Sequence, residues 1–378
     1  MAHKQPLTKR LALDKPAEID KYFKAAIKVQ ASDLHLKGGE LPRLRVSGGL
    51  RQTTGEPTAE EQLEKMIFEI LSPEQKDFFL DNGALDFAYD LGAKDRFRVN
   101  IYRTRGHVAL AARRVSSTVP AFETLNLPPA VQKIADFHQG LILVTGVTGC
   151  GKSTTIASML DHINRNRSCH IITVEDPIEF IFQDDKALIS QREIGVDVPD
   201  YEDALRSLMR EDPDVVLIGE MRDYETLTAG LRAAETGHQV FATLHSTDAY
   251  QTITRMLDLT PQIERHMIRQ AIVGNLRAVI SQRLLPTIRD DPQRVPAVEI
   301  MIANAPARKL IADEREVEIP TVIKSSYGEG MIDYAESLRQ LVETEYIDLK
   351  TAYNYAPNAE ELKMALKGIR STSGGILG

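Results

Sequence analysis

Residues 146–153, GVTGCGKS, carry the clearest chemistry in the sequence because they fit the pattern G-x-x-x-x-G-K-[ST]. They follow the apolar run LILVT and precede IASMLDHI, whose apolar residues recur at helical spacing. Glycines between a strand and a helix let backbone N–H groups surround phosphate oxygens, and the helix N-terminus adds partial positive charge. Lys152 would reach the β- and γ-phosphates, and the Ser153 hydroxyl would be offered to Mg²⁺. The predicted site for ATP and Mg²⁺ comprises Gly146, Val147, Thr148, Gly149, Cys150, Gly151, Lys152, Ser153 and Thr154.

Acidic residues follow two other apolar runs. The run Val215–Ile218 leads into Gly219 and Glu220, and an acid at the carboxyl end of a buried strand is placed to hold Mg²⁺. We therefore predict that Glu220 shares the metal with Ser153, with a simple capping acid as the alternative. The cluster EDPIE, which contains Glu175 and Glu179, follows the run HIITV. Three acids within five residues repel one another unless a cation is bound nearby, although a solvated loop would also explain them.

Two histidines and two cysteines are further candidates for chemistry. His238 and His245 bracket the run QVFATL, and the spacing leaves a structural role and a phosphate-sensing role equally open. They do not resemble a zinc site, because no further ligand cluster accompanies them. The chain has 2 cysteines, Cys150 and Cys169, which cannot form a four-cysteine zinc site or a disulfide framework. A redox role for Cys150 lacks a neighbouring resolving thiol, so we interpret it as the small residue that the glycine-rich loop needs.

The elements that must position these residues change in character along the chain. Before about residue 117, helical patterns such as PAEIDKYFKAAIKVQ and TAEEQLEKMIFEIL alternate with short strand patterns, and Thr58 is the predicted N-cap of the second helix. Later, the continuous apolar runs LILVTG, HIITVED, DVVLIGE and QVFATLH alternate with helical stretches, which indicates a largely parallel sheet covered on both faces. The pattern predicts an α/β nucleotide-binding core preceded by an α+β domain.

The predicted boundaries follow from these changes and from length. A chain of 378 residues is long for one core, and proline and serine accumulate in SSTVPAFETLNLPPA. We predict an α+β domain at 1–117, a linker at 118–132, the nucleotide-binding core at 133–302 and a helical region at 303–378, whose last residues, RSTSGGILG, are expected to be disordered.

Net charge and the distribution of apolar residues argue against some classes of protein. The formal net charge is −8, which argues against broad nucleic-acid binding. No apolar run approaches the roughly 20 residues that span a bilayer, and the N-terminus lacks the apolar centre of a signal peptide. We therefore expect a cytoplasmic protein.

Four blocks of the sequence together resemble the secretion ATPases of type II and type IV systems. GVTGCGKSTT resembles their Walker A motif, ITVEDPIEF their Asp box, DPDVVLIGEMRD their Walker B motif and TGHQVFATLHSTDA their His box. Outside the core, ASDLHL and RFRVNIYRTRG resemble the N-terminal domain of the type IV pilus retraction branch, the PilT/PilU family. The resemblance runs from about residue 18 to about residue 365.

This resemblance implies a RecA-like P-loop NTPase core with an N-terminal α+β PAS-like domain. It also implies a homohexamer that hydrolyses ATP between subunits and removes pilins from the pilus base, the retraction that drives twitching motility. Such a motor would lie at the cytoplasmic face of the inner membrane and act on an inner-membrane pilus platform protein, and no nucleic acid would be expected as a partner. The roles implied are Walker B acid for Glu220, Asp-box acids for Glu175 and Glu179, one of which polarises the attacking water, and His-box positions for His238 and His245.

An arginine-rich stretch gains a role from the same resemblance. The simplest interpretation of Arg96, Arg98, Arg103, Arg105 and Arg113 is a basic sheet face, to which some of them belong. In the resembled family, arginines of this region reach the phosphates of a nucleotide held by a neighbouring subunit, where a guanidinium stabilises developing charge. The resemblance favours Arg98 and Arg113 for this role.

Smaller features of the sequence indicate which branch of the family the chain resembles. The chain lacks the tetracysteine motif and the extra N-terminal domain of extension ATPases, which favours retraction. The segment ANAPARKLIADE only partly keeps the retraction signature AIRNLIRE, while ARRVSSTVPAFETL resembles the PilU subgroup. The alternatives are an accessory ATPase that assists a paralogous retraction ATPase, a nucleic-acid-translocating motor, and a nucleotide-dependent scaffold without hydrolysis.

Overall fold

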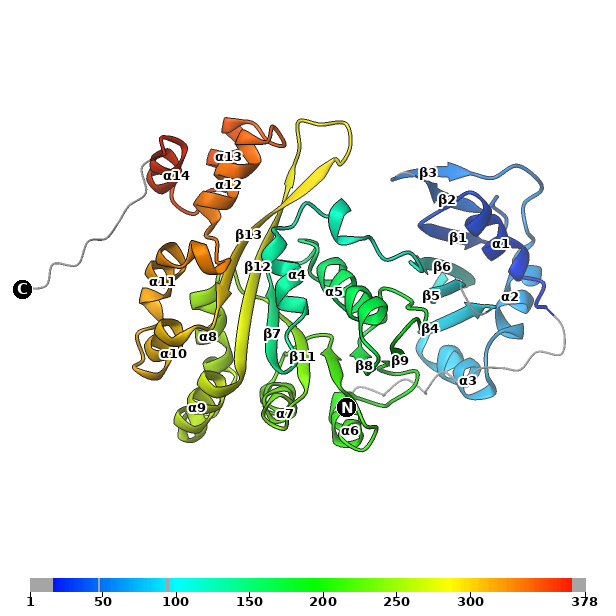
Figure 1. Ribbon diagram of the computed structural model, residues 1–378. Helices are drawn as coiled ribbons and strands as arrows, with labels where there is room; N and C mark the ends of the chain where they lie inside the picture. Colours follow the sequence, from blue (N-terminus) through cyan, green and yellow to red (C-terminus); the bar gives the residue numbers. More distant parts are fainter. Residues whose placement is uncertain (1–15, 47, 93–94, 369–378) are drawn as a thin grey trace, which may run out of the picture. The chain divides into compact units, whose positions relative to one another are not determined.

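The computed structural model describes residues 16–46, 48–92 and 95–368, and it divides the chain into two compact units (Figure 1). Of the described residues, the N-terminal unit contains those from Pro16 to Thr118 together with Asp176–Phe182 and Arg192–Asp203. The core unit contains Val119–Glu175, Gln183–Gln191 and the described residues from Ala204 to Gly368. A boundary near residue 117 therefore does not account for the two later segments that belong to the first unit. The predicted disordered tail, RSTSGGILG, lies outside the described residues.

The N-terminal unit is built on a six-stranded sheet of order β3-β2-β1-β6-β5-β4, whose paired strands are all antiparallel. The strands are β1 (Asp33–Lys37), β2 (Arg43–Val46), β3 (Gly49–Gln52), β4 (Ala84–Leu91), β5 (Asp95–Thr104) and β6 (His107–Val115). Because successive side chains of a strand point to opposite faces, Phe97 and Val99 of β5 are buried whereas Arg98 between them is exposed. This alternation places Arg98 on the outer face of the sheet, whereas Arg103 occupies an inner-face position at the end of β5, with its guanidinium 5.4 Å from the centre of the Phe79 ring.

In the described part of this unit, the sheet is accompanied by the helices α1 (Asp20–Lys28), α2 (Glu60–Glu69) and α3 (Pro73–Asn82). Phe23 of α1 and Phe79 of α3 are fully buried with the inner face of the sheet. The predicted N-cap of α2 is wrong, since the capping position is Ala59 and no side chain caps it. Thr58 instead shares a hydrogen bond between its hydroxyl and that of Tyr22, so a tertiary contact has replaced the local one.

The core unit contains a seven-stranded sheet of order β13-β12-β7-β11-β10-β8-β9. Its strands are β7 (Gly140–Thr145), β8 (His170–Glu175), β9 (Leu188–Glu193), β10 (Val215–Ile218), β11 (Gln239–Leu244), β12 (Leu276–Pro286) and β13 (Arg294–Ile302). The strands from β12 to β8 pair in parallel, and β13 is antiparallel to β12. The four apolar runs that predicted a parallel sheet are β7, β8, β10 and β11, which confirms the α/β class, whereas β9, β12 and β13 were not anticipated.

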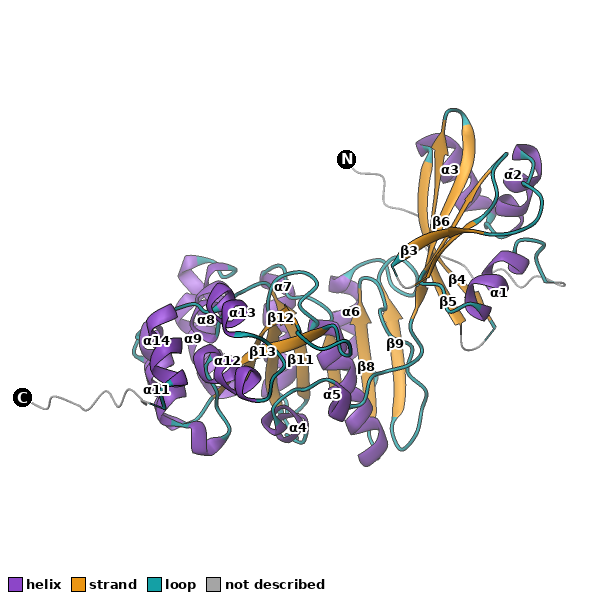
Figure 2. Cartoon of the chain, turned by 90° about the horizontal axis from the view of Figure 1, so that it is seen from above, coloured by secondary structure: helices purple, strands orange, loops and turns teal. Residues whose placement is uncertain are grey.

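Helices cover both faces of this sheet (Figure 2). Those that follow the chain to β12 are η1 (Phe122–Thr124), α4 (Pro129–Ala135), α5 (Lys152–Asn166), α6 (Tyr201–Leu208), α7 (Tyr224–Glu235), α8 (Ala249–Asp258), η2 (Gln262–Glu264) and α9 (Arg265–Asn275). Figure 2 shows α4 and α5 on one side of the sheet and α6 and α7 on the other. This covering explains why all six residues of β7 are buried.

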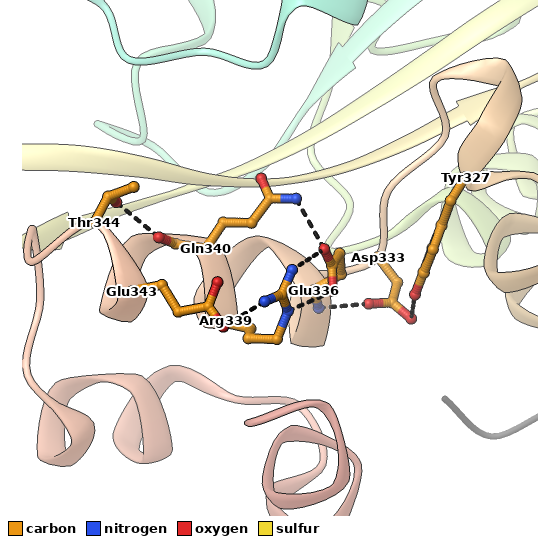
Figure 3. A network of polar contacts seen from close by, with 7 residues as sticks. All are labelled: Tyr327, Asp333, Glu336, Arg339, Gln340, Glu343 and Thr344. Atoms are coloured by element: carbon orange, nitrogen blue, oxygen red, sulfur yellow. Dashed lines mark hydrogen bonds and ion pairs between the residues drawn. The ribbon is translucent and has the colours of Figure 1, made fainter. Parts of the chain in front are cut away.

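The described residues after β13 form helices from Ala305 to Leu366, and these pack beside the β12–β13 hairpin (Figure 1). Its helices are α10 (Ala305–Ala312), η3 (Glu316–Glu318), α11 (Ile319–Ser325), η4 (Tyr327–Glu329), α12 (Tyr334–Glu343), α13 (Leu349–Tyr355) and α14 (Ala359–Leu366). Figure 3 shows the polar face of α12, where Arg339 donates to Glu336 at 2.6 and 2.8 Å and also pairs with Glu343. Its apolar face buries Tyr334 and Leu338 against the hairpin, so this region is part of the core unit's packing.

Candidate functional site

The glycine-rich loop joins β7 to α5 and lies against β12. Gly146 has φ +144°, and a Cβ there would stand 2.4 Å from the carbonyl oxygen of Gln282. Gly151 has φ +94°, and a Cβ there would stand 2.7 Å from the Gln282 side-chain nitrogen. Both positions need glycine for backbone conformation and for space. The loop is therefore held in a curled form by contact with a strand more than 100 residues away.

Gln282 is a site residue that the sequence analysis missed. Its side-chain Nε2 donates to the backbone carbonyl of Cys150 at 2.6 Å, and its Oε1 accepts from Thr155 Oγ1 at 2.9 Å. One buried amide thus ties the last turn of the loop to the first turn of α5. Sequence offers no signal for this role, because it depends on β12 lying next to β7.

The phosphate-binding groups predicted from the sequence come together around this loop. Lys152 Nζ donates to the carbonyls of Gly146 at 2.7 Å and Val147 at 3.3 Å, so its ammonium lies over the loop. Ser153 and Thr154 occupy the first turn of α5, and Gly151, the residue before the helix, has no side chain to cap its N–H groups. Those N–H groups and the ammonium carry positive charge at the start of α5, which suits a phosphate.

Cys150 is buried, with an exposed fraction of 2%. Burial raises the pKa of its thiol despite the nearby Lys152 ammonium, so the thiolate that redox chemistry needs is disfavoured. This supports the interpretation of Cys150 as a small packing residue.

Glu220 and His245 are brought together. Glu220 Oε2 accepts from Arg222 Nε at 2.7 Å, and Glu220 Oε1 lies 3.2 Å from His245 Nε2. The neighbouring strands are fixed to each other here, since Thr243 Oγ1 donates to the carbonyl of Gly219 at 2.6 Å. Arg222 was not singled out from the sequence, although it lies two residues after Glu220 in the same block.

The register of the parallel strands places Glu220 at the same sheet edge as the loop. Ile218 pairs with Ala242, and Leu244 pairs with Thr145, so Glu220 is level with the start of the loop and β11 lies between them. Two strand spacings correspond to about 10 Å, a gap that phosphates and a metal ion can bridge. Ser153 and Glu220 supply oxygen donors, which are the ligands that Mg²⁺ prefers, so the residues present fit this ion.

No group of three or more His, Cys, Asp or Glu side chains is arranged to hold a metal within residues 16–46, 48–92 and 95–368.

His238 lies away from this edge. Gln239 pairs with Gly140 at the start of the strands, whereas His245 follows their carboxyl ends, so the 6 residues of β11 separate the two histidines by about 20 Å. His238 Nδ1 lies 2.9 Å from the carbonyl of Ala233 and 3.0 Å from Thr236 Oγ1, at the end of α7. Within one chain, the structure therefore places His245 but not His238 at the edge that carries the loop.

The two Asp-box acids belong to different units. Glu175 is buried at the end of β8, where its Oε1 accepts from Thr173 Oγ1 at 2.7 Å and from Gln191 Nε2 at 3.3 Å. Glu179 is exposed and lies in the segment Asp176–Phe182, which groups with the N-terminal unit.

The two arginines favoured by the resemblance are directly opposite each other, with Arg98 on β5 facing Arg113 on β6. Arg113 is 75% exposed at its side chain, and its Nε donates to Asp33 Oδ1 at 2.9 Å. Burial alone would raise the pKa of Asp33, but hydrogen bonds from Ser32 and Arg113 hold the pKa below its usual value. Like charges directly opposite destabilise a sheet, and the Asp33 carboxylate offsets part of this repulsion by pairing with Arg113.

The described part of the chain contains no helix that is both long and apolar enough to cross a membrane.

Comparison with known proteins gives the family. A family model described as "Type II/IV secretion system protein" matches residues 14–318. The type IV pilus retraction ATPase PilT of Pseudomonas aeruginosa is 39% identical over 325 residues, which cover 86% of this chain and 94% of that protein. The type IV pilus ATPase PilU of the same organism is 33% identical over 350 residues, 93% of this chain and 91% of that protein. A crystal structure of the pilus retraction motor PilT with bound ADP superposes with a TM-score of 0.83 at 39% identity, covering 92% of this chain and 99% of that one. The chain therefore belongs to the type II/IV secretion system protein family.

Proposed function

We propose that the chain is a P-loop ATPase whose hydrolysis of ATP powers the retraction of type IV pili. The observation that carries this proposal is the single sheet edge on which the glycine-rich loop, Lys152, Ser153, Glu220 and His245 converge. Similarity to a pilus retraction ATPase over nearly the whole of both chains supplies the mechanical role.

ATP binding would use Lys152 and the backbone N–H groups of the glycine-rich loop, which already lie close together. Lys152 would exchange its bonds to the Gly146 and Val147 carbonyls for β- and γ-phosphate oxygens. The N–H groups of the loop and of the first turn of α5 would bind the remaining oxygens. Gln282 would keep the loop curled when the lysine moves.

Ser153 and Glu220 would hold Mg²⁺, which, when bound, neutralises charge on the β- and γ-phosphates. Arg222 and His245 share the Glu220 carboxylate and keep it directed across the sheet edge. His245 would also report the phosphate state to α8, because the His box runs directly into that helix.

Glu179 is the better candidate for the acid that positions the attacking water. Its carboxylate is exposed, whereas that of Glu175 is buried and accepts hydrogen bonds from Thr173 and Gln191. Glu175 would instead fix the end of β8, from which the Asp-box segment departs.

The finer assignments follow the family. We propose a homohexameric ring in which Arg98 and Arg113 reach the nucleotide of a neighbouring subunit, at the cytoplasmic face of the inner membrane and against the pilus platform protein. The accessory role beside a paralogous retraction ATPase remains the second candidate, because ANAPARKLIADE departs from the retraction signature and the chain is also 33% identical to PilU.

The first test is phosphate release by the purified chain. Lys152→Ala should abolish turnover by weakening nucleotide binding, whereas Glu220→Gln should bind ATP and hydrolyse it at least ~100-fold more slowly. Glu235→Gln, an exposed acid at the end of α7, is the matched control and should leave the rate unchanged. Near-normal turnover in both site variants would refute the ATPase assignment.

A second test separates the two pilus roles. The chain would be expressed in a type IV-piliated bacterium that lacks its retraction ATPases. Restored twitching by this chain alone supports the independent motor. Twitching that returns only when a second retraction ATPase is present supports the accessory role.

A further inference from the structure

We propose that Arg96 and Glu193 are positioning residues that fix the Asp-box segment carrying Glu179 to the N-terminal unit. The proposal rests on the function proposed above, and it assigns to these two residues a role that neither the motifs nor the relatives provide. All the contacts that carry it lie within the N-terminal unit.

Glu193 is the centre of the arrangement. It ends β9, and its Oε2 accepts from Arg96 Nη2 at 3.0 Å and from the backbone N–H of Ile178 at 3.3 Å. Ile178 directly precedes Glu179, so one carboxylate oxygen joins a strand of the N-terminal sheet to the backbone that carries the acid. The side chains of Arg96 and Glu193 are only 14% and 9% exposed, so water screens their attraction weakly.

The position of Arg96 is itself determined by the sheet. Arg96 pairs with Asp90 across β4 and β5, and its Nη1 lies 3.3 Å from Asp90 Oδ1. The guanidinium therefore bridges two carboxylates with separate nitrogens, a geometry that an ammonium cannot reproduce.

A second anchor lies on the other side of Glu179. The backbone N–H of Ile181 donates to the carbonyl of Ser116 at 2.9 Å, and Phe180 forms an isolated bridge with Ser116, directly after β6. Glu179 thus lies between two backbone attachments to the N-terminal unit, at residues 178 and 181. Its carboxylate is exposed while its backbone is held.

The residues proposed to bind ATP and the acid proposed to position water therefore belong to different units. Lys152, Ser153 and Glu220 belong to the core unit, whereas Glu179 is attached to the unit that also carries Arg98 and Arg113. Loss of the Arg96–Glu193 pair should therefore impair the chemical step and not the binding of ATP, because the nucleotide contacts of the loop are untouched. Misplacement of a catalytic group by about 1 Å can cost about 100-fold in rate.

The test uses the full-length chain with Arg96→Ala, Arg96→Lys and Glu193→Ala. We expect kcat to fall about 10- to 100-fold in both alanine variants with KM for ATP changed less than about 3-fold, and Arg96→Lys to recover part of the loss. Hydrogen exchange of backbone amides should quicken in residues 176–182 in the alanine variants. Arg114→Ala is the matched control, since Arg114 pairs with Asp95 at 2.7 Å in the same sheet and should change neither readout.

The decisive comparison is made in a Glu179→Gln background. If Arg96 and Glu193 act through Glu179, adding Glu193→Ala there should lower kcat by less than about 2-fold. The full loss in that background, or unchanged exchange in residues 176–182, would overturn the proposal. If Arg96→Ala does not fold, kcat of Arg96→Lys and Glu193→Gln is compared with and without Glu179→Gln in the same way. Absence of ATPase activity in the unaltered chain would refute the proposed function instead, and the exchange measurement would still decide whether the pair anchors the segment.

Discussion

At the scale of single residues, the glycine-rich loop depends on a side chain that no motif contains. Gln282 satisfies the Cys150 carbonyl and the Thr155 hydroxyl, both of which are buried in the first turns of the phosphate site. A buried polar group left without a partner costs about 1–3 kcal/mol. The Gln282 amide therefore stabilises the curled form of the loop through its two hydrogen bonds, to the Cys150 carbonyl and to the Thr155 hydroxyl.

Gln282→Leu should weaken ATP affinity by about 10-fold and lower the melting temperature, because two buried groups lose their partner. Titration with a fluorescent ATP analogue and thermal unfolding measure the two effects. Gln270→Leu, on the exposed side of α9, is the control and should change neither. Wild-type affinity in Gln282→Leu would show that the loop holds its form without this amide.

The arginine pair makes a second residue-scale prediction. Arg113→Gln should reduce kcat at least ~10-fold with a smaller effect on ATP affinity, because a guanidinium directed at a transferring phosphoryl group acts on the transition state. Arg51→Gln, on the exposed edge strand β3, is the control. Steady-state kinetics distinguish the outcomes, and an unchanged kcat in Arg113→Gln would remove Arg113 from the catalytic proposal.

At the scale of elements, α8 has an unusual attachment to the sheet. The N–H of Ala249, its first residue, donates to Glu299 Oε1 of β13 at 2.8 Å, and Glu299 is buried. Burial raises the pKa of Glu299 to about 7, with Asp248 and Asp333 adding repulsion and Arg283 opposing it. The helix α8 directly follows the His box, which lies at the sheet edge that carries the glycine-rich loop. The Glu299 carboxyl therefore links this edge, through α8, to the β12–β13 hairpin.

The raised pKa predicts a pH dependence of stability. Between the unfolded pKa near 4.5 and the folded pKa of about 7, the folded state binds more protons, so stability decreases as pH rises through this range. Glu299→Gln keeps a hydrogen-bond acceptor for Ala249 without the charge. In the variant, the free energy of unfolding should fall much less over this pH range. The fall that Glu299 causes in the unaltered chain is at most about 3 kcal/mol.

Thermal unfolding of both proteins from pH 4.5 to pH 8 measures this prediction. The variant should melt higher than the unaltered chain at pH 8 and about equally at pH 5. Parallel curves for the two proteins would mean that Glu299 titrates near its ordinary value.

At the scale of the whole molecule, the groups proposed for catalysis are divided between the two units. Lys152 and Glu220 lie on the core unit, and Arg113 and Glu179 lie on the N-terminal unit. In a ring, successive subunits make head-to-tail contacts, so a nucleotide site can draw one set of groups from each of two chains. Hydrolysis would then depend on assembly.

Mixing two inactive variants tests this dependence. Lys152→Ala and Arg113→Gln chains, mixed as dissociated subunits and then assembled, should recover ATPase activity, since about one quarter of random interfaces join an intact loop to an intact arginine. Activity measured against oligomer size by light scattering should appear with the ring. Full activity in a monomer, or no recovery on mixing, would place all the catalytic groups within one chain.

Much of the fold was accessible from sequence alone. The strands β7, β8, β10 and β11 were found as continuous apolar runs, because a strand covered on both faces leaves no polar alternation. The loop at residues 146–153 was found because its residue types are fixed by local backbone geometry and by phosphate chemistry. The family followed from four motifs in their expected order and is confirmed by the comparisons.

Only the tertiary structure decided which of these residues meet. Thr155 and Gln282 are 127 positions apart, and Arg96 and Glu193 are 97 apart, so their contacts depend on strand order and not on local pattern. His238 and His245 lie at opposite ends of β11, and the parallel register with β7 and β10 decides which of these ends carries the glycine-rich loop and Glu220. The physical reason is that hydrophobic periodicity specifies which face of an element is buried, whereas the partner across that face is chosen by how the whole chain packs.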